Sequence, residues 1–207
     1  MFVVSTFRNT IRIHPADFAK DPQTAIADEI NRLYANKVVL NIGLCICLYD
    51  LTEVGDAYIV SSDGSTRTEV VFRLIVFRPF EGEVVSGTIR RSIPSGIIVN
   101  IGTFFDDVFI PAENLQPGTI FNPDLQEFVW TFAEQELRME ADSRIRFRVV
   151  ADRFSDLTPV HTEAPRFVDN DIAVTRTVAS AEDPYKRPYM VIGSASDSGL
   201  GLEAWWE

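Results

Sequence analysis

Three arginines on one predicted strand are the side chains of this sequence best suited to bind phosphate. Arg144, Arg146 and Arg148 alternate with apolar residues between positions 144 and 149. Because successive side chains of a strand point to opposite faces, the three guanidinium groups share one face. Such a strip can follow an RNA backbone, or it can pair with carboxylates on neighbouring strands. The sequence leaves both interpretations open.

Two further pairs of residues belong to the same candidate RNA-binding surface. Arg90 and Arg91 follow a predicted strand and add two cations. Phe104 and Phe105 could stack on bases, an interaction that contributes roughly 1–3 kcal/mol per base. A place in the core or against a partner is the alternative for these rings, and we expect it for one or both.

Recognisable catalytic and metal-binding patterns are missing from the sequence. It has no G-x-x-x-x-G-K-[ST] phosphate loop and no G-x-S-x-G nucleophile turn. Asp106 and Asp107 lack further oxygen ligands, so a solvated turn is the better interpretation. Cys45 and Cys47 are too close along a strand for an easy disulfide and too few for zinc, which predicts two packed thiols in a reducing compartment. We expect no catalytic residue, no metal and no cofactor.

Charge and composition limit the class of protein further. The 207 residues carry a net charge of −11, and 46% of them are hydrophobic, so a packed core is possible. Residues 1–80 are nearly balanced, whereas residues 81–207 carry 11 basic and 21 acidic side chains. A surface that grips nucleic acid all over is therefore excluded, and any RNA contact must be local. No apolar run is long enough to span a membrane and the start does not resemble a signal peptide, so we expect an intracellular protein.

The elements that must position these residues differ between the two parts of the chain. Asp21 and Pro22 predict the start of a helix that presents apolar residues at helical spacing and ends near Asn36. Strands are predicted at 2–7, at 38–51 with both faces covered, and at 70–80. Turn signals occur at 55–56 and 63–64. Residues 1–80 are thus predicted to form an α+β unit.

From Gly82 onward the sequence predicts an all-β unit. Residues 82–102 follow the pattern G-x-V-x-x-G-x-I, six residues, then G-x-x-V-x-I-G, which resembles the S1 RNA-binding domain, a five-stranded OB-fold barrel. Further barrel strands are expected at 108–110, 144–150 and 189–193. The polar, proline-punctuated segment at about 155–188 is predicted to be an insertion.

The flanks of this motif narrow the resemblance to one family. The N-terminal unit leads directly into the barrel through residues 76–84, and the chain ends Trp-Trp-Glu. Together with residues 105–111, these features resemble the family formed by the larger of the two stalk proteins of archaeal and eukaryotic RNA polymerases. The RNA polymerase III paralogue is the most similar. The resemblance covers nearly the whole chain except 155–188.

The resemblance implies a non-catalytic stalk subunit in the nucleus. Residues 1–80 would be a tip domain that docks on the RNA polymerase core, and residues 81–207 a barrel near nascent RNA. A smaller helical subunit would complete a heterodimer, and initiation factors are further possible partners. The expected role is in transcription initiation and in synthesis of small RNAs such as tRNA and 5S rRNA. Tyr49, Asp50 and Leu51 would lie at the end of the tip that touches polymerase or partner, unless they form a plain strand and loop.

Several features qualify the RNA-binding expectation. S1 domains that bind RNA usually carry an aromatic on the second strand and a histidine on the third, where this chain has Ile98 or Val99 and Ile110. We therefore expect weak, electrostatic RNA binding.

The alternatives to a polymerase III stalk subunit are a free-standing S1-type RNA-binding factor and the equivalent stalk subunit of another nuclear polymerase, while no motif favours a hydrolase. The terminal Trp205 and Trp206 are expected to fold back and help close the barrel, or else to face a partner.

Overall fold

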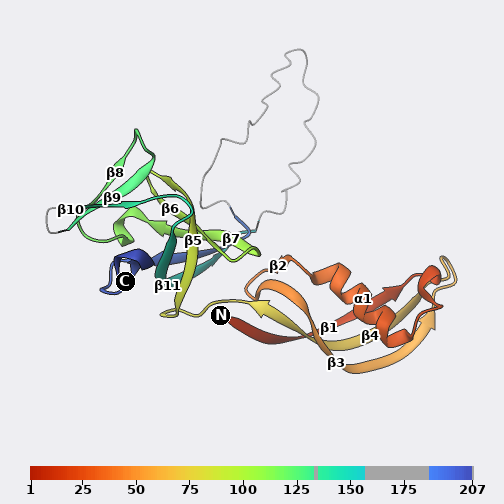
Figure 1. The fold of residues 1–207 in the computed structure, drawn as a ribbon. Coiled ribbons are helices and arrows are strands. Elements are labelled where there is room, and N and C mark those ends of the chain that lie inside the picture. Colours follow the sequence, from red (N-terminus) through yellow and green to blue (C-terminus); the bar gives the residue numbers. More distant parts are fainter. Residues whose placement is uncertain (133–134, 157–186, 207) are drawn as a thin grey trace, which may run out of the picture.

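The computed structural model describes residues 1–132, 135–156 and 187–206, so the predicted insertion at 155–188 lies almost entirely outside the described residues. Figure 1 shows two lobes, one with the N-terminal strands and α1, the other with the later strands. Strands dominate both lobes. The described part of the chain is therefore mostly β, with one α-helix, as the sequence predicts.

The N-terminal lobe is an antiparallel sheet of order β1-β4-β3-β2 with a helix on one face. Its elements are β1 (Phe2–Ile13), η1 (Pro15–Asp17), α1 (Pro22–Tyr34), β2 (Lys37–Val39), β3 (Gly43–Ile59) and β4 (Thr66–Phe77). The helix begins where the sequence predicts, because the Asp21 carboxylate accepts a hydrogen bond from the Thr24 backbone N–H at 3.2 Å. Buried Ile26 and Ile30 pack α1 against the sheet.

Three expectations for this lobe are wrong. Strand β1 continues to Ile13 instead of ending at residue 7, because it pairs with β4 along its whole length. Strand β3 runs through the predicted turn at 55–56 to Ile59, and an irregularity in pairing with β4 between Val54 and Ala57 accommodates the glycine there. Coverage on both faces stops at Cys45, since Cys47 and Tyr49 are exposed. The turn at 63–64 is confirmed.

The second lobe contains a closed ring of strands. Its strands are β5 (Val84–Ile93), β6 (Gly96–Ile101), β7 (Phe105–Pro111), β11 (Arg144–Phe154), β12 (Tyr189–Ser194) and the short β13 (Gly201–Leu202). They follow the order β12-β7-β6-β5-β11-β13, and β12 also pairs with β11. That last pairing closes five strands into a barrel, whose core contains Ile145, Phe147 and Val149. All five predicted barrel strands are present.

A small antiparallel sheet, which the sequence did not predict, separates the third and fourth barrel strands. It consists of β8 (Thr119–Asn122), β9 (Glu127–Phe132) and β10 (Gln135–Met139) in the order β10-β9-β8. Phe128 and Met139 from this sheet are buried in the barrel core. Short strands give few alternating positions, and only their packing against the barrel makes their two faces different.

Phenylalanine rings join the two lobes. Phe77, the last residue of β4, is fully buried in the same core cluster as the barrel residues. Its ring centroid lies 4.8 Å from that of Phe105, 5.2 Å from that of Phe104 and 5.7 Å from that of Phe2. The Arg78 guanidinium reinforces the junction through an ion pair of 2.9 Å with Asp152 on β11.

Candidate RNA-binding and partner-binding surfaces

The arginine strip on β11 has the geometry that the sequence predicts. Arg144, Arg146 and Arg148 are exposed, and the alternate residues between positions 145 and 149 are buried in the barrel. The three guanidinium groups therefore lie on the outside of one strand. We call Arg144, Arg146 and Arg148 the arginine strip.

Carboxylates accompany two members of the strip. Arg148 Nε lies 3.0 Å from Asp197 Oδ2, and Arg144 Nη1 lies 3.8 Å from Glu203 Oε2. Arg146 has no ion-pair partner among residues 1–132, 135–156 and 187–206. The structure thus shows carboxylate pairing at both ends of the strip and leaves its middle cation open to a ligand.

Arg90 and Arg91 do not extend the arginine strip. Arg90 Nη1 lies 3.3 Å from Asp106 Oδ2 on β7, so its guanidinium is directed away from β11, which flanks β5 on the opposite side. Arg91 is partly buried and has a partner of its own. Asp107 follows Asp106 on β7, and burial raises the pKa of its carboxyl above the usual range. The Arg187 guanidinium, whose Nε lies 3.4 Å from Asp107 Oδ1, lowers that pKa in part.

Phe104 and Phe105 belong to the junction between the lobes, so Phe105 has the core position that the sequence predicts for one or both rings. Base stacking by Phe104 stays a prediction. Phe105 is buried, and its ring contacts Phe77 and Tyr189 at centroid distances of 4.8 and 5.4 Å. Phe104 is half-buried and packs edge-on against Phe77. A ring that stacks on a base needs a free face, and Phe105 has none to offer.

Tyr49, Asp50 and Leu51 lie in the middle of β3, not at an end of the lobe. The Asp50 carboxylate accepts hydrogen bonds from both Nε and Nη2 of Arg73 on β4. The hydrogen bond from Arg73 lowers the pKa of Asp50. The Arg73 guanidinium also lies 5.1 Å from the centroid of the exposed Tyr49 ring, while Leu51 packs against the core. Tyr49 is thus the member of this trio with a surface free for a partner.

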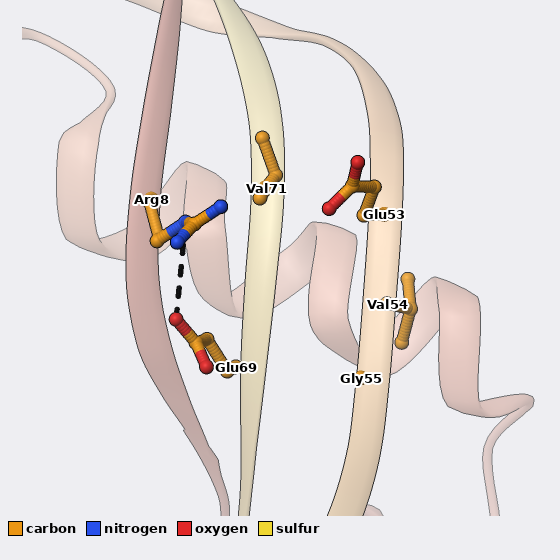
Figure 2. Close-up of a pocket in the computed structure, with 6 residues that line it drawn as sticks. All are labelled: Arg8, Glu53, Val54, Gly55, Glu69 and Val71. Carbon is orange, nitrogen blue, oxygen red and sulfur yellow. Dashed lines mark ion pairs between the residues drawn. The ribbon is translucent and has the colours of Figure 1, made fainter.

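The sheet face opposite α1 is left open by the residues that the structure describes, and we call it the open face. Figure 2 shows Arg8, Val71 and Glu53 on three adjacent strands, with α1 behind them. Arg8 and Glu53 are both register partners of Val71, so the three form one row across the sheet. A shallow hollow of about 250 Å³ lies over this row. Arg8 also pairs with Glu69 at 3.8 Å.

A cleft lined by aromatic side chains lies between the small sheet and the C-terminal segment, and we call it the tryptophan cleft. Sequence analysis missed it. Trp130 and Phe132 on β9 form one wall, and Trp205 and Trp206 form the other. The Trp130 ring centroid lies 5.0 Å from that of Phe132 and 5.0 Å from that of Trp205. The cleft holds about 400 Å³. The alternation Phe128, Trp130, Phe132 was the available signal, but it did not indicate which face would meet the chain terminus.

The two terminal tryptophans have different roles. Trp205, in the short helix η3 (Glu203–Trp205), is half-buried against the barrel core, which confirms that it folds back. Trp206 is 48% exposed, although its indole N–H donates to the Leu200 carbonyl at 3.1 Å. Trp205 therefore packs against the barrel, whereas the adjacent Trp206 remains exposed.

The described residues form a β-rich protein of two lobes. Within residues 1–132, 135–156 and 187–206, no group of three or more His, Cys, Asp or Glu side chains could hold a metal ion. In the same ranges, no helix is long and apolar enough to cross a membrane. Three surfaces of the described residues are candidates for binding other molecules: the arginine strip, the open face and the tryptophan cleft.

Comparison with known proteins then gives the family. The family model of RNA polymerase III subunit Rpc25 matches residues 83–206, and the model of the SHS2 domain found in the N terminus of Rpb7p and Rpc25p matches residues 8–64. This chain belongs to the Rpc25 family of RNA polymerase III subunits.

Full-length relatives agree with this assignment. The chain is 42% identical to the DNA-directed RNA polymerase III subunit rpc8 of Schizosaccharomyces pombe, with 100% of both proteins covered. It is 39% identical to the bovine subunit RPC8, over 100% of this chain and 98% of that protein. It is 27% identical to the RNA polymerase II subunit RPB7 of Saccharomyces cerevisiae, over 72% of this chain and 86% of RPB7. The predicted similarity to the polymerase III paralogue is therefore confirmed.

Proposed function

We propose that this chain is the larger, non-catalytic stalk subunit of a nuclear RNA polymerase III. In this role it acts in transcription initiation and contacts nascent RNA during synthesis of small RNAs such as tRNA and 5S rRNA. The observation that carries the proposal is the 42% identity over the whole length of a polymerase III subunit. Alignment over both lobes favours a polymerase subunit over a free-standing RNA-binding factor.

The division of labour between the lobes belongs to the same proposal. Residues 1–80 act as a tip domain and residues 81–207 as an S1-type OB barrel, a class in which five strands close into a small barrel that binds oligonucleotides. Closure of β11 on β12 supports the barrel assignment. The open face supports docking of the tip, because Val4, the register partner of Ile75, and Tyr49, whose ring lies under the Arg73 guanidinium, are exposed there.

Affinity purification of the tagged full chain tests the stalk assignment. We expect the polymerase III core and one smaller helical subunit to be recovered and identified by mass spectrometry. A Val4→Asp, Tyr49→Asp double variant should recover less of at least one of them, because charge on the open face opposes burial. Phe18→Asp, an exposed position between η1 and α1, is the matched control. Recovery of a different polymerase core identifies a paralogue, and migration of the chain alone favours the free-standing factor.

RNA binding should be weak, salt-sensitive and dependent on Arg146 more than on its neighbours. Arg146→Ala removes the strip cation that has no carboxylate partner in the described ranges, so affinity for single-stranded RNA should fall several-fold. The salt slope should decrease by roughly 0.7, the value per phosphate contact on a single strand. Arg148→Ala should matter less, because its guanidinium already pairs with Asp197.

Fluorescence titrations of oligouridylate and mixed-sequence RNA into the co-purified complex at two salt concentrations measure this effect. Arg138→Ala is the matched control, since it removes the same charge from β10, where Arg138 pairs with Glu127 at 2.8 Å. Glu203→Gln should strengthen binding, because it frees Arg144 and removes an anion that also accepts from Ser86 at 2.7 Å. Equal affinity of the Arg146 variant and the parent would contradict the arginine strip as the RNA contact.

A further inference from the structure

All three tryptophans of the chain line one cleft at the barrel. Trp130 comes from β9, whereas Trp205 and Trp206 come from the C-terminal segment. Phe132 and Leu137 complete the apolar part of the lining. This site is the tryptophan cleft described above. Its volume of about 400 Å³ is that of an ordinary ligand pocket.

The tryptophan cleft is held in shape before any ligand binds. The Trp130 indole N–H donates to the Pro117 carbonyl at 3.1 Å, and the Trp206 indole N–H donates to the Leu200 carbonyl. Both indoles are thereby fixed by their edges, while Phe132 remains 59% exposed and Trp206 48% exposed. Rings that are already ordered lose little conformational entropy on binding, which favours affinity. Exposure of large apolar rings on such a fixed surface is typical of protein-binding sites.

The charges of the residues in and around the cleft favour a peptide over a nucleic acid as its ligand. None of the described residues that line the cleft is charged, so a phosphate there would have no cation beside it. Asp197 lies between the lining serines Ser196 and Ser198, and its partly exposed carboxylate already carries an ion pair of 3.0 Å with Arg148. Residues 81–207 also carry an excess of ten acidic side chains. An incoming segment with positive charge is therefore attracted, and an RNA strand is repelled.

We propose that the tryptophan cleft binds an extended, proline-containing and basic segment of a partner protein. Aromatic-lined grooves bind polyproline II segments because their proline rings pack flat on aromatic faces and their backbone is already extended. Arginine in such a segment can place its guanidinium over an indole face, which adds cation–π attraction. None of the three strip arginines lines the cleft, although Arg148 pairs with Asp197 beside it, and the proposal does not depend on RNA binding.

Tryptophan fluorescence of the full chain reports on this cleft alone, because no other tryptophan exists. The probe is a synthetic peptide of repeated Pro-Pro-Arg triplets without aromatic residues. Since polyproline II has about three residues per turn, the arginines share one edge and the prolines the others. We expect a saturable change in emission. A Pro-Pro-Glu peptide of the same length should bind at least about tenfold more weakly, a difference of about 1.4 kcal/mol.

Variants locate the binding site. Phe132→Ala and Leu137→Ala leave all three reporters in place and should each weaken Pro-Pro-Arg binding, the former by about tenfold, as for a central aromatic anchor. Ile120→Ala is the matched control, because Ile120 lies on β8, does not line the tryptophan cleft and is 69% exposed. Circular dichroism and the melting temperature verify that each variant is folded.

Four results would overturn the proposal. They are an unchanged emission with the Pro-Pro-Arg peptide, equal binding of the acidic peptide, a saturable response to oligouridylate in place of the peptide, and full binding by folded Phe132→Ala and Leu137→Ala variants. The oligouridylate result would assign the cleft to RNA.

Discussion

Replacement of Phe77 by alanine is expected to lower the free energy of unfolding by about 3–5 kcal/mol, the usual loss for a buried phenylalanine. Phe77 is fully buried and contacts rings from both lobes, among them Phe2 and Phe105. The cavity would open at the junction, where neighbouring backbone is held by two different sheets and cannot easily collapse. The loss should therefore lie near the upper end of the range.

Cooperativity should change as well. The parent chain is expected to unfold in one transition, because the two lobes share the core cluster that contains Phe77. Phe77→Ala should separate the transition into two, measurable by calorimetry and by urea denaturation followed with circular dichroism. Phe18→Ala, at an exposed position, should leave both stability and cooperativity nearly unchanged. A single transition at the parent midpoint in the Phe77 variant would show that the lobes do not depend on this ring.

Replacement of Gly87 by valine should destabilise the barrel by about 4 kcal/mol or more, which exceeds the usual effect of overpacking. A Cβ atom at Gly87 would lie 2.5 Å from Val99 Cγ1 and 2.6 Å from the Asn100 carbonyl oxygen. The carbonyl belongs to the backbone of β6, the register partner of β5, so relief requires movement of the strand itself. The two further methyl groups of valine would increase the overlap.

Chemical denaturation of the purified variant measures this loss. Val84→Ala is the control on the same strand, because Val84 is exposed and its truncation should cost less than about 1 kcal/mol. A folded Gly87→Val chain with the parent midpoint would mean that β5 and β6 are farther apart at this position than the structure indicates. It would also contradict the close approach of β6 as the reason why position 87 is a glycine.

The fold was largely accessible from the sequence where a local rule determined the outcome. Capping by Asp21 and the proline after it gave the start of α1, and alternation on β11 gave both the buried residues and the exposed arginine strip. The predicted turn at 55–56 was wrong, because a glycine that lies inside a paired strand does not form a turn. Here β4 pairs with β3 on both sides of that position.

The candidate sites were harder to predict from the sequence, because they depend on which distant segments of the chain meet. Whether Arg146 or Arg148 is open to phosphate depends on where Asp197 lies, some fifty residues further along the chain. Phe104 and Phe105 have the residue type that stacks on bases, yet the junction with Phe77 places Phe105 in the core. Neither fact follows from spacing along the sequence.

By itself the sequence determined the helix start and the face of the arginines, because capping and local hydrophobic periodicity specify them. Its motifs indicated the barrel strands and the family by resemblance. Tertiary structure alone decided which surfaces remain open. Closure of β12 on β11 brings the C-terminal segment beside β9, and only then do Trp130 and Trp205 come within 5.0 Å of one another. The physical reason is that burial and ion pairing depend on distances between segments far apart in the chain, whereas sequence patterns describe neighbours.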